Sequence, residues 1–199
     1  MTTDRMPRLR LPTRSTRNPA PITQQRRLAL IRRLLTDHRV PMRERVAGLL
    51  LLLYAQPVSR IVRLTVDDVG RVDDQVVLRL GDPAATVPAL FADLLLSLAC
   101  NRTNMVTAGN HDARWLFPGR RPGQPMQPRS LAPLLRARGI PVQNGRAAAI
   151  RQLVLQAPPP VVAGMLGYHD KTTTRLVLEA GGSWNRYASG DHSRRIPNG

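Results

Sequence analysis

The order of apolar and polar residues predicts a chain that is mostly helical. Thr23 is a good N-cap for a first helix, whose apolar face is formed by Leu28, Ile31, Leu34 and Leu35. Four arginines cover much of the remaining surface of this helix: Arg26, Arg27, Arg32 and Arg33. A second helix, from Pro41 to about Tyr54, is apolar enough to lie at the centre of a domain.

The period of the pattern changes near residue 75. Alternating residues from Val76 to Leu80 are typical of a strand. Gly81-Asp82-Pro83 predicts a turn, and Thr86 to Pro88 predicts a short returning strand. Helical spacing is found elsewhere, over residues 59–64, 91–99, 130–138, 145–156, 159–166 and 171–180. The sequence therefore predicts a mainly α fold with a small antiparallel β-sheet over about residues 75 to 88.

The net charge of the chain indicates the kind of partner that it binds. Thirty Lys and Arg residues against thirteen Asp and Glu give a formal net charge of +17. Such a chain is attracted to polyanions, because neutralised phosphates release their condensed counterions. Residues 1–20 and 189–199 are basic and poor in apolar residues, which predicts a disordered basic arm and tail around one folded domain over residues 21–188.

Several other classes of protein lack support in the sequence. The longest apolar run, Val46 to Ala55, is too short for a membrane span, and the N-terminus has no apolar secretion signal. Cys100 is the only cysteine, and the four histidines have no metal-ligand spacing. Phosphate-binding loops and dinucleotide fingerprints are absent from the sequence. We expect a cytoplasmic protein with no membrane, metal or cofactor.

Four short motifs occur in an order that resembles one family. They are RERVAGLLLLLYAQPVSRIVRLTVDDV from Arg43, VVLRLGDPAATVPA from Val76, RWLFPGRRPGQPM from Arg114 and VVAGMLGYHDKTTTR from Val161. In this order they resemble the opening helix pair, the β-hairpin, the Leu-Phe-Pro segment and the Leu-Gly-His block of the tyrosine-recombinase (phage-integrase, Xer-like) catalytic domain. The resemblance covers about residues 22–187 and implies both that fold and binding to double-stranded DNA.

The resemblance also implies where catalytic residues should stand. The family holds the scissile phosphate with two arginines, moves protons with a lysine and two histidine-type residues, and attacks with a tyrosine. The first arginine position falls on Pro57, with Arg60 one turn later. The His-x-x-Arg motif becomes Gln143-Asn144-Gly145-Arg146, which keeps only the arginine.

The remaining catalytic positions are also altered. The hairpin from Gly81 to Ala85 has no lysine, and the second histidine position holds Tyr168, with His169 beside it. The nucleophile would stand near Val177 or Leu178, and neither side chain can attack phosphorus. We therefore expect catalysis to be impaired or absent.

Two residues remain as catalytic candidates, Arg146 and a displaced nucleophile at Tyr187. An alternative role for Tyr187 is to anchor the C-terminus together with Trp184. The DNA-binding candidates are Arg60, Arg120, Arg121, Arg146, His169, Lys171, Thr172, Thr173 and Arg175. Beyond double-stranded DNA, we consider a full-length recombinase, or a second copy of this chain on DNA, as a partner.

Two other hypotheses fit the sequence. Val161 to Gly181 also resembles a helix-turn-helix, with Gly167 at the turn and Asp170 as the N-cap of its second helix. That pattern would make the chain a sequence-specific transcriptional regulator. The third hypothesis is an active recombinase that uses Tyr187 as its nucleophile. Both the integrase-like and the helix-turn-helix hypotheses place DNA near Lys171 to Arg175.

Overall fold

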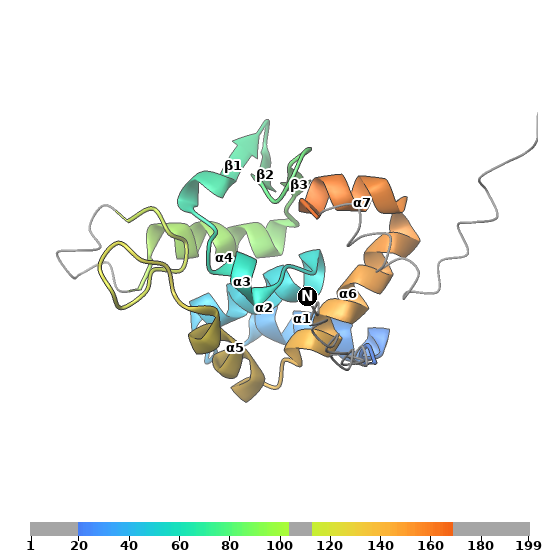
Figure 1. The fold of residues 1–199 in the computed structure, drawn as a ribbon, viewed down its shortest axis with the longest axis horizontal. Helices are drawn as coiled ribbons and strands as arrows, with labels where there is room; N and C mark the ends of the chain where they lie inside the picture. The colour runs from blue at the N-terminus through green and yellow to red at the C-terminus, as the bar shows by residue number, and fades with distance from the viewer. Residues whose placement is uncertain (1–19, 104–112, 169–199) are drawn as a thin grey trace, which may run out of the picture.

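The structure, a computed structural model, describes residues 20–103 and 113–168. Its elements follow the order α1 (Gln24–Thr36), α2 (Met42–Tyr54), α3 (Val58–Ile61), η1 (Val66–Asp68), β1 (Val69–Val72), β2 (Gln75–Leu78), β3 (Ala85–Thr86), α4 (Ala89–Cys100), α5 (Pro128–Ala137), α6 (Val142–Gln156) and α7 (Pro159–Leu166). The fold is mainly helical with one small antiparallel sheet, which confirms the predicted fold class (Figure 1). The predicted arm, tail and helix 171–180 lie outside the described residues.

Helix α2 is the centre of the molecule. Its residues from Val46 to Leu52 are all buried, and α1, α4, α5 and α6 pack around it (Figure 1). A helix that is apolar on every side is stable only when other elements surround it. The predicted central position of this helix is therefore confirmed.

Helix α1 buries a different face from the predicted one. Thr23 caps it as expected and accepts a hydrogen bond from the amide of Arg26 at 3.2 Å. Leu28, however, is 39% exposed, and Leu30 takes the expected place in the core. Arg27 is buried rather than on the surface, because its Nε donates to the carbonyl of Leu52 at 2.9 Å.

The sheet has one strand more than the sequence predicted. Strand β1 pairs with β2 in the register Val69↔Leu78 to Val72↔Gln75, and β2 pairs with β3 at Val77↔Thr86. The turn between β1 and β2 places Asp73 at a φ of 51°, a left-handed conformation that Asp tolerates. Leu80, expected at the end of the strand that starts near Val76, lies just beyond β2 but is buried.

The remaining elements lie close to their predicted positions. Helix α7 has the predicted bounds, whereas α6 begins three residues early and α5 two residues early. The Leu-Phe-Pro segment is anchored in the core, since the amide of Leu116 donates to the carbonyl of Leu64 at 2.8 Å and Phe117 is buried. Within the described residues, no helix combines the length and apolar character needed to cross a membrane.

Candidate functional site

Segments that are far apart in the sequence meet where α2 ends. The chain leaves α2 through Gln56, α3 contributes Arg60, α6 contributes Arg146, and Tyr168 follows α7. We call these four residues the arginine cluster. The helices around α2 therefore bring Arg60 and Arg146 into one region. The resemblance had placed Arg60 near the first phosphate-holding position and Arg146 at the second.

The carbonyl of Ala55 joins two members of the cluster. Ala55 ends α2 in the left-handed conformation, with a φ of 55°. Its oxygen accepts hydrogen bonds from Nε of Arg146 at 2.8 Å and from the hydroxyl of Tyr168 at 2.5 Å. The guanidinium carbon of Arg146 also lies 5.5 Å from the centre of the Tyr168 ring, within cation–π range. Tyr168 therefore holds Arg146 in one orientation.

Arg60 uses its donors inside the protein. Its Nη1 donates to the carbonyls of Leu166 at 2.6 Å and Gly167 at 2.8 Å, and its Nη2 donates to the carbonyl of Leu80. The last carbonyls of a helix lack partners within the helix and carry partial negative charge, which favours a cation there. Arg60 therefore links the C-terminal end of α7 to the segment that follows β2.

Gln56 is fully buried within the cluster. Its Nε2 donates to the carbonyl of Tyr54 at 3.1 Å and, more weakly, to that of Leu166 at 3.4 Å. Its Oε1 finds no hydrogen-bond partner among the described residues. Gln56 therefore adds a second tie between the end of α2 and the end of α7.

Three glycines allow the hairpin to touch α7 directly. The amide of Asp82 donates to the carbonyl of Gly164 at 3.0 Å. A Cβ added to Gly81 would come within 1.9 Å of that same carbonyl oxygen, and one added to Gly167 would come within 2.3 Å of the Leu80 carbonyl. At this turn the hairpin and α7 are therefore in direct contact.

The arginine cluster contains two positive side chains, Arg60 and Arg146, and Arg146 belongs to a segment rich in arginine. Residues 113–168 contain eight arginines and no Asp or Glu. Within the described parts of the chain, no carboxylate forms an ion pair with Arg60 or Arg146. Burial raises the pKa of Tyr168, and the charges of Arg146 and Arg60 oppose that shift only in part. Tyr168 is therefore a neutral hydrogen-bond donor at physiological pH.

The structure divides the predicted DNA-binding residues into three groups. Arg60 and Arg146 lie in the cluster. Arg120 and Arg121 are exposed in the loop after Phe117, which Figure 1 shows at the opposite end of the molecule from α7. The other candidates lie outside the described residues, namely His169, Lys171, Thr172, Thr173, Arg175 and Tyr187. The second helix of the helix-turn-helix hypothesis lies there too.

Sequence reasoning missed two parts of the cluster. Gln56 carries no recognisable motif, and the carbonyl of Ala55 acts through the backbone, which no side-chain pattern reveals. The left-handed turn at Gly167, with a φ of 62°, had a signal in the Leu-Gly-Tyr sequence, since glycine is favoured where a helix ends this way.

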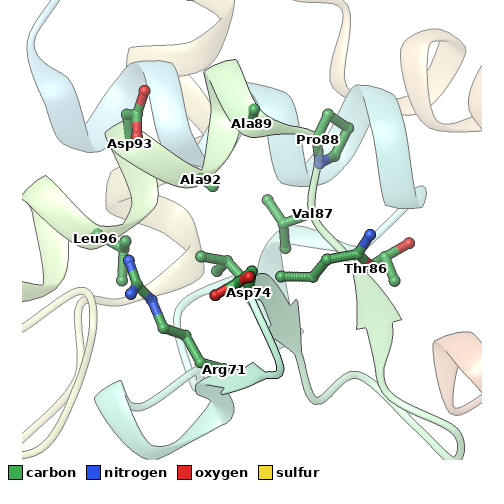
Figure 2. Close-up of a pocket in the computed structure, with 11 residues that line it drawn as sticks. Arg71, Asp74, Thr86, Val87, Pro88, Ala89, Ala92, Asp93 and Leu96 are labelled. Carbon is green, nitrogen blue, oxygen red and sulfur yellow. The ribbon is translucent and has the colours of Figure 1, made fainter.

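A separate hollow of about 470 Å³ lies between the sheet and α4. Figure 2 shows Arg71 extending from β1 toward Leu96 of α4, with Asp74 between the two elements. None of the residues that line this hollow belongs to the arginine cluster. In the described ranges, no group of three or more His, Cys, Asp or Glu residues is placed to hold a metal ion.

The fold is that of the catalytic domain of tyrosine recombinases. Among solved structures, a lambda integrase dimer bound to a COC' core site matches with a TM-score of 0.50 and 15% identity, over 85% of this chain and 51% of that chain. A lambda integrase(75-356) dimer bound to a COC' core site matches with a TM-score of 0.49 and 14% identity, over 92% of this chain and 64% of that chain.

The likeness is one of structure. At the level of sequence, no protein family and no curated protein matches this chain. The chain spans 51% and 64% of the lengths of the two integrase chains.

Proposed function

We propose that this chain binds double-stranded DNA on the scaffold of a tyrosine-recombinase catalytic domain, without cleaving it. The observation that carries the proposal is Arg146, held by Ala55 and Tyr168 on this fold with no carboxylate partner among the described residues. A guanidinium whose charge is not neutralised and whose orientation is fixed is well suited to contact a phosphate.

The distribution of charge supports the same proposal. The acidic residues of the described chain all lie before residue 104, whereas residues 113–168 carry eight arginines alone. Arg114 and Arg138 of this segment pair with Asp67 and Glu44, and the positive charge of its other six arginines attracts a polyanion. The basic residues Lys171 and Arg175 follow directly in the sequence and extend this part of the chain.

The proposed absence of cleavage rests on the resemblance, which leaves several catalytic positions without the residues that the chemistry needs. Pro57 stands at the first arginine position, where it is the N-cap of α3. The hairpin turn has no lysine and is bound to α7 through Asp82. Removing one transition-state donor typically costs about 3 to 4 kcal/mol, and no neighbour replaces several missing groups at once.

The integrase structures also suggest how many chains act together. Both are described as dimers bound to a core site. By analogy, we propose that this chain works on DNA beside a second copy or a full-length recombinase.

The direct test is the affinity for a labelled duplex of the full chain and two variants. Arg146→Ala removes a phosphate contact and should weaken binding by about tenfold, as expected for a hydrogen bond to a charged group. Arg151→Ala removes the same charge from an exposed position on α6 and should weaken binding by about twofold or less. Equal effects of the two substitutions, or no duplex binding by the unmodified chain at low salt, would contradict the proposal.

A further inference from the structure

We infer that Arg60 is a positioning residue, which fixes Tyr168 and through it orients Arg146 for contact with DNA. This inference rests on the proposed function. It assigns Arg60 a role that differs from direct contact with a phosphate. The contacts that connect the two arginines run from Arg60 to Gly167 and Tyr168, and from Tyr168 to Arg146.

The first step is the contact between Arg60 and the end of α7. The guanidinium bridges the carbonyls of Leu166 and Gly167 on one side and the carbonyl of Leu80 on the other. A planar guanidinium with several donors in a fixed geometry can span carbonyls of two elements, whereas the ammonium of a lysine is a single compact charge. Arg60 therefore fixes the α7 end against the hairpin in a way that lysine cannot reproduce.

The second step passes through Gly167. Its φ of 62° turns the chain out of α7, and its missing side chain leaves room for Arg60 and the hairpin. A Cβ at this position would lie 2.5 Å from Nη2 of Arg60 and 2.3 Å from the carbonyl oxygen of Leu80. Any side chain at residue 167 would thus push the end of α7 away from both.

The third step leads to Arg146. Tyr168 follows Gly167 directly, and its amide donates to the carbonyl of Ala163 at 2.8 Å. Its ring supports the Arg146 guanidinium, and both side chains share the carbonyl of Ala55. A displacement of Gly167 would move the ring and leave Arg146 with one restraint fewer.

The most informative variant is Gly167→Ala, because it breaks these contacts without changing any charge. We expect it to weaken duplex binding by about tenfold, as Arg146→Ala does. The matched control is Gly139→Ala, where φ is 70° and an added Cβ has no neighbour within 4 Å. This control carries the same left-handed strain without the clash, so its affinity should stay within about twofold of the unmodified chain.

A second variant covers the case in which Gly167→Ala does not fold. Arg60→Lys keeps the charge and loses the bridge, so it should weaken binding, whereas Arg63→Lys, at an exposed position just after α3, should not. Unchanged affinity of Arg60→Lys would show that Arg60 acts only as a charge and would overturn the inference. So would unchanged affinity of a folded Gly167→Ala variant.

Double variants show whether Gly167 and Arg60 act on DNA binding through Arg146, which a merely structural role would not produce. In the Arg146→Ala background, Gly167→Ala and Arg60→Lys should each add less than about a twofold loss, since their effect passes through Arg146. Full additivity would overturn the inference.

Hydrogen exchange separates failure of this inference from failure of the proposed function. The amides of Tyr168 and Asp82, bonded to Ala163 and Gly164, should exchange faster in Arg60→Lys than in the unmodified chain, with or without DNA. Exchange that is unchanged would overturn the contacts proposed for Arg60. Faster exchange in a chain that has no affinity for DNA would remove the DNA-binding function and, with it, the role of Arg60 in orienting Arg146.

Discussion

Arginine side chains donate hydrogen bonds to backbone carbonyls at the C-terminal ends of several helices in this protein. Five of them donate to carbonyls in the last turn or at the C-cap of a helix: Arg27 to Leu52, Arg33 to Arg138, Arg45 to Leu34, Arg60 to Leu166 and Arg146 to Ala55. Such carbonyls have no partner within their own helix, and a cation near them is favoured by the helix dipole. Part of the arginine excess is therefore structural, which the net charge alone does not reveal.

The buried side chain of Tyr54 leads to a prediction about how stability depends on pH. Burial raises the pKa of Tyr54, whose hydroxyl donates to the carbonyl of Thr86 at 2.7 Å. In the unfolded chain this phenol ionises near pH 10, whereas in the folded chain it stays protonated. Stabilisation from Tyr54 is therefore complete below about pH 10 and is lost as the pH rises above that value.

This loss can be measured by urea unfolding at pH 7 and at several values above pH 10. The unmodified chain should lose stability with rising pH more steeply than Tyr54→Phe, which has no phenol at this position. Tyr54→Phe should itself be less stable at pH 7 by about 1 kcal/mol, because a hydrogen bond is lost. Parallel pH curves for the two proteins would contradict the assignment.

Helices and strands were predictable to different extents. The 3.6-residue spacing of apolar residues identified the helices, and Pro41, the N-cap of α2, marked where that helix begins. Strand β1 was not predicted, because Val69 to Val72 is short and includes Gly70 and Arg71, which weaken an alternating pattern. The buried face of α1 was misjudged because Arg27 is stabilised by a distant carbonyl, a contact that local spacing does not contain.

The capping of α1 by α2 leads to a prediction about stability. Arg45 is 3% exposed and donates to the carbonyls of Leu34 and Leu35 at the end of α1. Arg45→Met keeps much of the volume but leaves these carbonyls without donors, so it should lower the free energy of unfolding by about 2 kcal/mol.

The control for this substitution is Arg39→Met. Arg39 pairs with Asp37, and its side chain is 93% exposed, so Arg39→Met should lower the free energy of unfolding much less than Arg45→Met does. Urea denaturation of both variants measures the difference. A loss of similar size in the two would show that Arg45 does not cap α1.

At the scale of the whole molecule, the fold could be predicted from the sequence more fully than the site. Four motifs in a fixed order, with helices and a hairpin between them, predicted a tyrosine-recombinase-like fold. The solved lambda integrase is similar in fold at only 15% sequence identity. The cluster depends instead on backbone carbonyls and on Gln56, which are brought together only by folding. The resemblance assigned Arg146 and Tyr168 to catalytic positions of the family, but it could not show that both side chains donate to the carbonyl of Ala55.

The absence of cleavage is a prediction for the whole chain. Incubation with a labelled suicide duplex, followed by denaturation, should yield no covalent protein–DNA adduct, because several of the required groups are missing. An adduct that disappears on Tyr187→Phe would make Tyr187 the nucleophile. An adduct that persists in Tyr187→Phe would point to another nucleophile, and either result would contradict a purely binding role.

The central claim, that this recombinase fold binds DNA through its uncompensated arginines, is tested most directly by the salt dependence of duplex affinity. Binding that neutralises several phosphates should weaken by about one to three decades between about 50 and 200 mM salt. Arg146→Ala should reduce the slope of log affinity against log salt by about one. An affinity that does not change with salt, or no binding at the lowest salt, would contradict the account.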